Sequence, residues 1–142
     1  MSIAELVPSS MAVTEHANAL LEVAFLMSAV DGNLADEELA TFSALVARVR
    51  GHEATKAEIG ALLEGFVFSA HTGGVADRVR EVAMSLPAEL RVPAFTVAVA
   101  LAMVDNDASV HEGELVGILA EALGLSDRVT ELTAAAKTAS AT

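Results

Sequence analysis

Two short acidic segments carry the residues whose types and spacing could bind a metal ion. Residues 31–39 read DGNLADEEL, and residues 107–115 read DASVHEGEL. Aligned without gaps, both begin with Asp, carry an aliphatic residue at the fourth position and end in Glu-Leu. The Asp and the Glu bracket one short loop, which is close enough for the two carboxylates to share a cation or a set of backbone N–H groups. The candidate ligands are Asp31 and Glu38 in the first segment and Asp107 and Glu114 in the second.

The pattern of each segment is typical of a tight connection between two helices. The Asp ends one helix, Gly32 permits the positive φ that turns the chain, and the Glu falls in the first turn of the next helix. A negative charge is favoured there by the helix dipole. The same acids could therefore do no more than stabilise helix ends. In the second segment, Ser109 and Glu112 form a possible capping box, and Glu114 provides a charge that the helix dipole favours. The residues themselves leave both interpretations open.

The spacing from the Asp to the Glu in each segment equals the spacing from position five to the bidentate Glu at position twelve of an EF-hand loop. The segments therefore match the second half of such a loop. Position one would be Met27 in the first copy and Met103 in the second, so the entry carboxylate is absent from both. A calmodulin-type EF-hand is therefore not expected. Position three would be Ala29 in the first copy and Asp105 in the second. The second copy is the richer in carboxylates and the better metal candidate, and Asp105 joins the candidate ligands.

Motifs for catalysis are missing from the sequence. The chain has no cysteine, which excludes a disulfide framework, a catalytic thiol and a thiolate metal site. It has no Walker loop, no G-x-S-x-G elbow and no H-E-x-x-H. None of the four histidines follows a Glu by three residues, as a di-iron bundle would require. We expect a protein that is not an enzyme.

Length and composition predict one all-α domain over residues 1–142. The chain is 54% hydrophobic with only 4% aromatic residues, and Ala, Leu and Val favour helix packing over strands. The uncharged run from Val92 to Val104 is shorter than the ~20 residues that cross a bilayer. No basic region precedes an apolar stretch at the N-terminus, so we expect no signal peptide and a cytoplasmic location.

The formal net charge of −12 restricts the possible partners. Such a field repels nucleic acid and anionic lipid, and it attracts cations or basic protein segments. The acidity could also do no more than keep an apolar helical domain in solution. We expect no nucleic-acid partner and no membrane span.

Caps and periodicity predict a bundle of about seven helices between residues 10 and 138. Thr55 and Glu58 form a capping box, Gly51 stops the helix before it, and Ser126 is expected to cap the last helix. Proline is tolerated in a first turn, so Pro87 and Pro93 are placed at or near the start of the fifth. The expected helices cover about 10–30, 36–50, 55–71, 75–85, 87–104, 111–123 and 126 onwards.

The fifth helix is apolar on all sides, which predicts a central, buried position with Ala98, Leu101 and Ala102 in the core. The alignment of the acidic segments extends upstream, where Ala24 and Met27 match Ala100 and Met103. The segments 20–50 and 96–126 are therefore predicted to be two pseudo-repeated helix–acidic turn–helix hairpins.

Residues 20–39, LLEVAFLMSAVDGNLADEEL, resemble the first motif of the TerB-like family of tellurite resistance proteins, and residues 100–115 resemble its second motif. The resemblance covers nearly the whole chain, with Ala108 in place of the second glycine. It implies an all-helical fold and a calcium-like site at Asp31, Glu38, Asp107 and Glu114. An acidic chain without a thiol is poorly suited to bind or reduce tellurite, an oxyanion, so an indirect role in tellurite or stress response is expected.

Two functions follow as hypotheses. The first is a non-enzymatic, cation-responsive scaffold that binds Ca²⁺, or Mg²⁺, at the acidic turns and docks another protein. The second is a metal-free helical adaptor, in which the acids only cap helices and a groove between helices binds a partner peptide.

Overall fold

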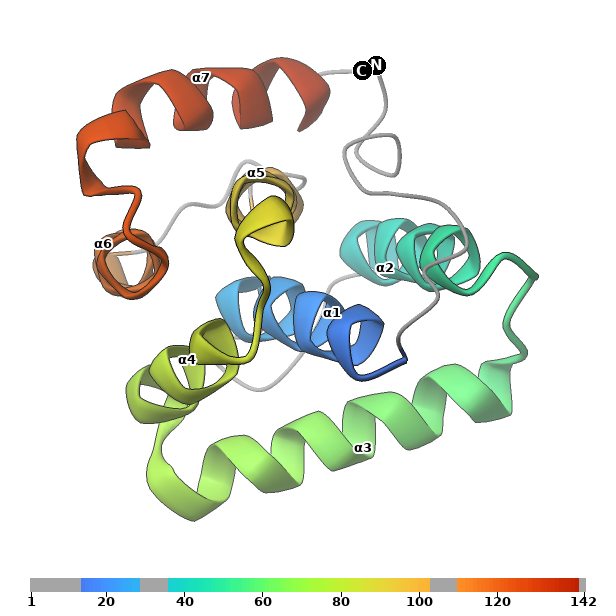
Figure 1. The fold of residues 1–142 in the computed structure, drawn as a ribbon. Coiled ribbons are helices and arrows are strands. Elements are labelled where there is room, and N and C mark those ends of the chain that lie inside the picture. The colour runs from blue at the N-terminus through green and yellow to red at the C-terminus, as the bar shows by residue number, and fades with distance from the viewer. Residues whose placement is uncertain (1–13, 29–35, 103–109, 141–142) are drawn as a thin grey trace.

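The structure, a computed structural model, describes residues 14–28, 36–102 and 110–140 of the chain. Every regular element in these ranges is a helix, which confirms the predicted all-α class (Figure 1). The elements are α1 (Thr14–Ser28), α2 (Asp36–Arg50), α3 (Lys56–Gly73), α4 (Val75–Met84), α5 (Ala88–Ala102), α6 (Val110–Leu123), the short 3-10 helix η2 (Ser126–Arg128) and α7 (Val129–Ser140).

Helices α1 and α5 form the centre of the core. They pack against each other more extensively than any other pair of described elements, with α2, α4, α6 and α7 around them (Figure 1). Every residue from Ala19 to Met27 in α1 is buried, as is every residue from Ala94 to Leu101 in α5. Both helices contain long apolar stretches with little polar surface to expose to water, so they occupy the interior.

The predicted burial of the fifth helix is confirmed at two of its three residues. Ala98 and Leu101 have no exposed surface, and the side chain of Ala102 lies outside the described part. Pro93, by contrast, stands inside α5 rather than near its start. Its missing N–H leaves the carbonyl of Glu89 without a helical partner, and because Glu89 is exposed, water can take that place.

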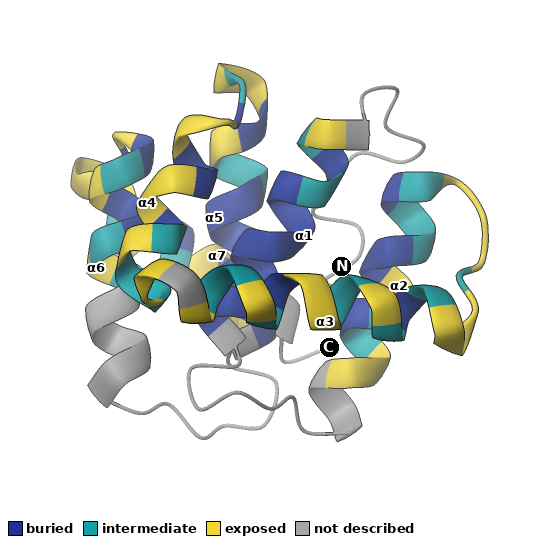
Figure 2. Ribbon diagram, turned by 90° about the horizontal axis from the view of Figure 1, so that it is seen from below, coloured by how far each residue is buried: buried dark blue, intermediate teal, exposed yellow. Residues whose placement is uncertain are grey.

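Helix directions follow from the contact between α1 and α4. Ser85, just beyond the end of α4, and Glu15, at the start of α1, line the same pocket, so the two helices are antiparallel. Helix α5 begins three residues after Ser85 and therefore starts at the same end as α1. Figure 2 agrees, since α1 and α5 run in one direction while α2 and α6 run back. The C-terminal ends of α1 and α5 thus face the same side of the molecule.

Glycines with positive φ end three of the helices. Gly51, Gly74 and Gly124 have φ values of 78°, 89° and 74°, a region that other residues rarely adopt. The predicted loop at residues 72–74 was too long: α3 runs to Gly73, and Gly74 alone separates it from α4. The chain can turn at a single residue because glycine has no Cβ to clash there.

One of the two predicted N-caps is present. The Glu58 N–H donates to the Thr55 hydroxyl at 3.2 Å, as the capping box at the start of α3 requires. The predicted cap at Ser126 was wrong, because Ser126 opens the 3-10 helix η2 and α7 begins at Val129. Leu125 is buried directly before it, which favours a tight turn that keeps this side chain in the core.

Helix α3 lies along the edge of the bundle, across α1 and α4 (Figure 1). Ile59 and Phe66 anchor it, and the Phe66 ring lies 5.8 Å from that of Phe25. Phe68 on the outer side is 75% exposed. In the described ranges no single helix is long and apolar enough to cross a membrane, although α3 and α4 together, bent by 112°, meet the criteria of length and composition.

Candidate functional site

The structure places the predicted metal ligands only in part. Asp31, Asp105 and Asp107 lie outside the described residues. Glu38 and Glu114 belong to α2 and α6, near the start of each helix as predicted, and their side chains lie outside the described part as well. Whether the five carboxylates meet therefore stays a prediction.

Among the side chains that the structure describes, no three His, Asp or Glu residues are grouped so that they could hold a metal ion. The predicted carboxylate ligands all belong to the acidic segments after α1 and α5. Their donor set is made of oxygen ligands alone, which suits calcium or magnesium rather than zinc or copper.

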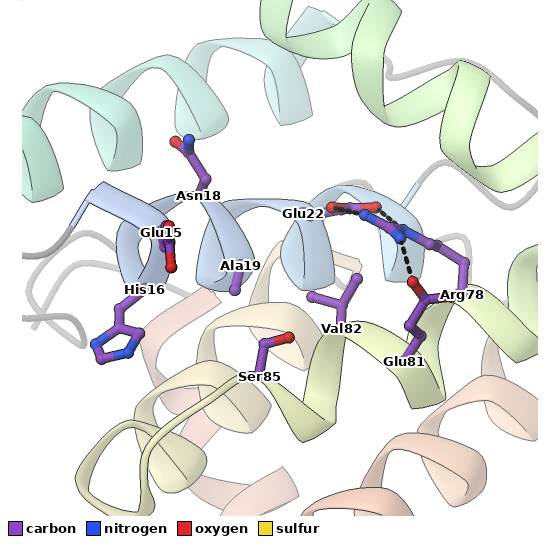
Figure 3. A pocket seen from close by; sticks show the side chains of 9 residues that line it. All are labelled: Glu15, His16, Asn18, Ala19, Glu22, Arg78, Glu81, Val82 and Ser85. Atoms are coloured by element: carbon purple, nitrogen blue, oxygen red, sulfur yellow. Dashed lines mark hydrogen bonds and ion pairs between the residues drawn. The ribbon is translucent and has the colours of Figure 1, made fainter.

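A pocket of about 410 Å³ lies between α1 and α4 (Figure 3). Helical spacing places Glu15, Asn18 and Glu22 in a polar stripe along α1, and these residues form part of the pocket wall. Helix α4 lies opposite, because its buried residues Val79, Val82 and Ala83 face the core and leave its charged residues at the edge. The lining residues are Glu15, His16, Asn18, Ala19, Glu22, Arg78, Glu81, Val82 and Ser85.

A buried ion pair forms one side of this pocket. Glu22 is only 6% exposed, and the Arg78 guanidinium donates to both of its carboxylate oxygens, through Nε at 2.5 Å and through the terminal nitrogen at 2.9 Å. The other terminal nitrogen of Arg78 donates to Glu81 at 3.0 Å. Figure 3 shows Arg78 held between the two glutamates. Such forked contacts fix both the position and the plane of the guanidinium.

The electrostatics of the pocket favour a cation. The hydrogen bond and charge of Glu22 raise the pKa of Arg78 above its ordinary value, so this residue stays charged. Three glutamates and one arginine line the pocket, which leaves two negative charges in excess when His16 is neutral. Since Arg78 is already engaged by two carboxylates, the pocket has little capacity to attract an anion.

A second hollow of about 230 Å³ lies on the other side of Arg78, between α3 and α4. Its lining is Phe68, Ser69, Gly73, Arg78 and Glu81. Arg78 and Glu81 belong to both hollows, so the ion pair separates a carboxylate-lined pocket from one beside an exposed aromatic ring.

Helical spacing alone groups Glu15, Asn18 and Glu22 into a polar stripe on α1, but it does not indicate the partner of that stripe. Arg78 is 56 positions away along the chain, and nothing in its local sequence indicates α1 as its neighbour. A glutamate within an otherwise apolar helix was the available signal, because a buried carboxylate requires a cation or several donors. Asn18 points away from α4 in Figure 3, and its Oδ1 is buried without a hydrogen-bond partner among the described residues.

Comparison with known proteins gives one finding. The family model of tellurite resistance protein TerB matches residues 17–135, from the first helix into the last. No curated protein and no solved structure matches the chain.

Proposed function

The chain belongs to the family of tellurite resistance protein TerB, and we propose that it is a non-catalytic binding domain that takes up a divalent cation, calcium in particular, at the two acidic segments. The proposed ligands are Asp31, Glu38, Asp105, Asp107 and Glu114. A role in tellurite or other stress response is then indirect, exerted through a cation-responsive scaffold.

The parallel arrangement of α1 and α5 carries the proposal. Both helices start at the same end of the bundle, so Ser28 and Ala102 end them on the same side. The first candidate ligand after each helix, Asp31 or Asp105, stands three residues beyond the helix end. Two carboxylate-rich segments that leave neighbouring helices from one end are well situated to share an ion, although they are far apart along the chain.

Thermal unfolding tests this function. A cation that binds only the folded chain adds RT ln(1 + [L]/Kd) to the free energy of unfolding, which is ~2.7 kcal/mol at one hundred times the Kd. Millimolar calcium should raise the melting temperature beyond the effect of sodium chloride at equal ionic strength, and chelator should reverse the rise. A response equal to that of the sodium control contradicts the proposal.

A metal-free adaptor is the second candidate function, and one observation favours it. The two hollows beside Arg78 form a recessed surface that includes Phe68, which is 75% exposed. Aromatic side chains are enriched in the surfaces that bind another protein. Protein binding at this surface is compatible with either function, because the surface is formed by α1, α3 and α4 and does not include the acidic segments.

A further inference from the structure

The surface beside Arg78 has the chemistry of a receptor for a basic protein segment. We infer that a partner protein docks there through a lysine or arginine side chain in the α1–α4 pocket and an apolar side chain beside Phe68. The inference rests on the adaptor function and names the chemistry of its partner. It does not depend on cation binding by the acidic segments.

Charge complementarity is the first argument. Glu22 is neutralised by Arg78, and Arg78 also engages Glu81, so this cluster of three side chains retains one negative charge. Glu15 adds a second at the start of α1. An alkylammonium or guanidinium group entering the pocket would meet carboxylates, while an acidic group would be repelled.

The shape and lining of the pocket provide the second argument. Ala19 and Val82 are buried and give it an apolar part, on which the aliphatic stem of a lysine or arginine can lie with its charged end at either Glu15 or Glu81. The volume of about 410 Å³ is ample for one such side chain.

A protein segment fits better than a free amine because the surface continues past the pocket. Arg78 and Glu81 also line the hollow of about 230 Å³ that holds the exposed Phe68. A small amine would fill only the carboxylate-lined side. A peptide that places a basic and an apolar residue on the two sides of Arg78 uses both hollows, and the fixed plane of the guanidinium separates them.

Nuclear magnetic resonance on the ¹⁵N-labelled full chain tests the inference with defined probes. The main probe is a short capped peptide of alternating lysine and leucine, and the others are the same peptide with glutamate for lysine, the same with alanine for leucine, and n-butylammonium chloride. The lysine–leucine peptide should give saturable amide shifts around both hollows, at Ala19, Val82, Ser69 and Gly73. The glutamate peptide should give none.

Variants sharpen the test. Glu15→Gln and Glu81→Gln should each raise the Kd of the lysine–leucine peptide about two- to fivefold, the range of exposed charge pairs. Phe68→Ala should raise it about fivefold or more. Glu121→Gln is the matched control, because this exposed glutamate of α6 lines neither hollow, and it should leave the Kd unchanged.

Three results would overturn the inference. Amide shifts confined to another face of the protein would show that the peptide binds there, which is compatible with an adaptor function but not with this surface as its site. A Kd that is the same in the wild type and in both glutamine variants would show that the carboxylates of the pocket do not contribute to peptide binding. Butylammonium binding as tightly as the peptide would make this a site for a free amine.

Discussion

At the scale of single residues, the Glu22–Arg78 pair is the feature that most constrains the α1–α4 contact. Glu22 is nearly inaccessible and Arg78 is about one-quarter exposed at its side chain. Removal of the cation leaves a buried carboxylate without compensation, which is costly, whereas the net contribution of an intact pair is small. The pair therefore determines how α4 lies on α1 more than how stable the domain is.

Arg78→Ala should consequently destabilise the protein by about 2–4 kcal/mol, somewhat below the cost of breaking a fully buried pair because water reaches the guanidinium. Glu81→Gln is the control, since Glu81 is 72% exposed at its side chain and its loss should cost less than ~1 kcal/mol. Urea unfolding of both variants measures the difference. A loss below ~1 kcal/mol for Arg78→Ala would mean that Glu22 finds other donors.

Glu131 provides a prediction on pH at the start of α7. The hydrogen bond and charge of Arg128 lower the pKa of Glu131 below its ordinary value, and both groups are at the surface. Because the folded pKa is depressed, the stabilisation is present above the unfolded pKa and is lost as pH falls through the folded pKa. A ¹³C titration of the carboxyl group should show the low pKa, and Arg128→Ala should raise it. An unchanged pKa in that variant would contradict the ion pair.

At the scale of elements, glycines on α3 and at its end should respond to alanine with opposite signs. Gly60 and Gly65 lie within α3 and have open space where a Cβ would stand. Gly60→Ala and Gly65→Ala should each stabilise the protein by about 0.5–1 kcal/mol. Gly74 also has open space but a φ of +89°, so Gly74→Ala should destabilise by about 1–3 kcal/mol through backbone strain alone. Thermal unfolding shows whether each variant is more or less stable than the wild type. Stabilisation by Gly74→Ala would contradict the observed turn.

The central position of α5 gives a second prediction at this scale. Leu101 is fully buried near the end of α5, where it belongs to the main core. Leu101→Ala should cost about 2–5 kcal/mol in urea unfolding, the range for buried leucines. Met84→Ala is a suitable control because Met84 is 82% exposed, and it should have little effect. A loss of less than ~1 kcal/mol at Leu101 would show that α5 is peripheral.

At the scale of the whole molecule, local signals were sufficient for the helices but not for their contacts. The stop at Gly51, the cap at Thr55 and the apolar character of 92–104 act within a few residues, and they predicted α2, α3 and α5 close to their observed bounds. Two local assignments were wrong: Pro93 stands inside α5 rather than near its start, and η2 lies between Ser126 and the start of α7.

The candidate site, too, was predictable only in its local part. The polar stripe of α1 is visible from helical spacing, whereas its pairing with Arg78 depends on how α4 folds back onto α1. The repeat of 20–50 in 96–126 stays a prediction, supported by the common direction of α1 and α5 and of α2 and α6. The connections within each hairpin, residues 29–35 and 103–109, lie outside the described part of the chain.

Calorimetric titration with calcium tests the central claim most directly, because it measures binding rather than its effect on stability. The wild-type chain should release or absorb heat in a saturable titration, and Asp107→Asn and Glu114→Gln should each abolish that heat while leaving the helical content unchanged. Glu121→Gln, which makes the same change at an exposed site on α6, should bind as the wild type does. Absence of heat at millimolar calcium, or heat that survives both substitutions, would show that these acids only cap helices.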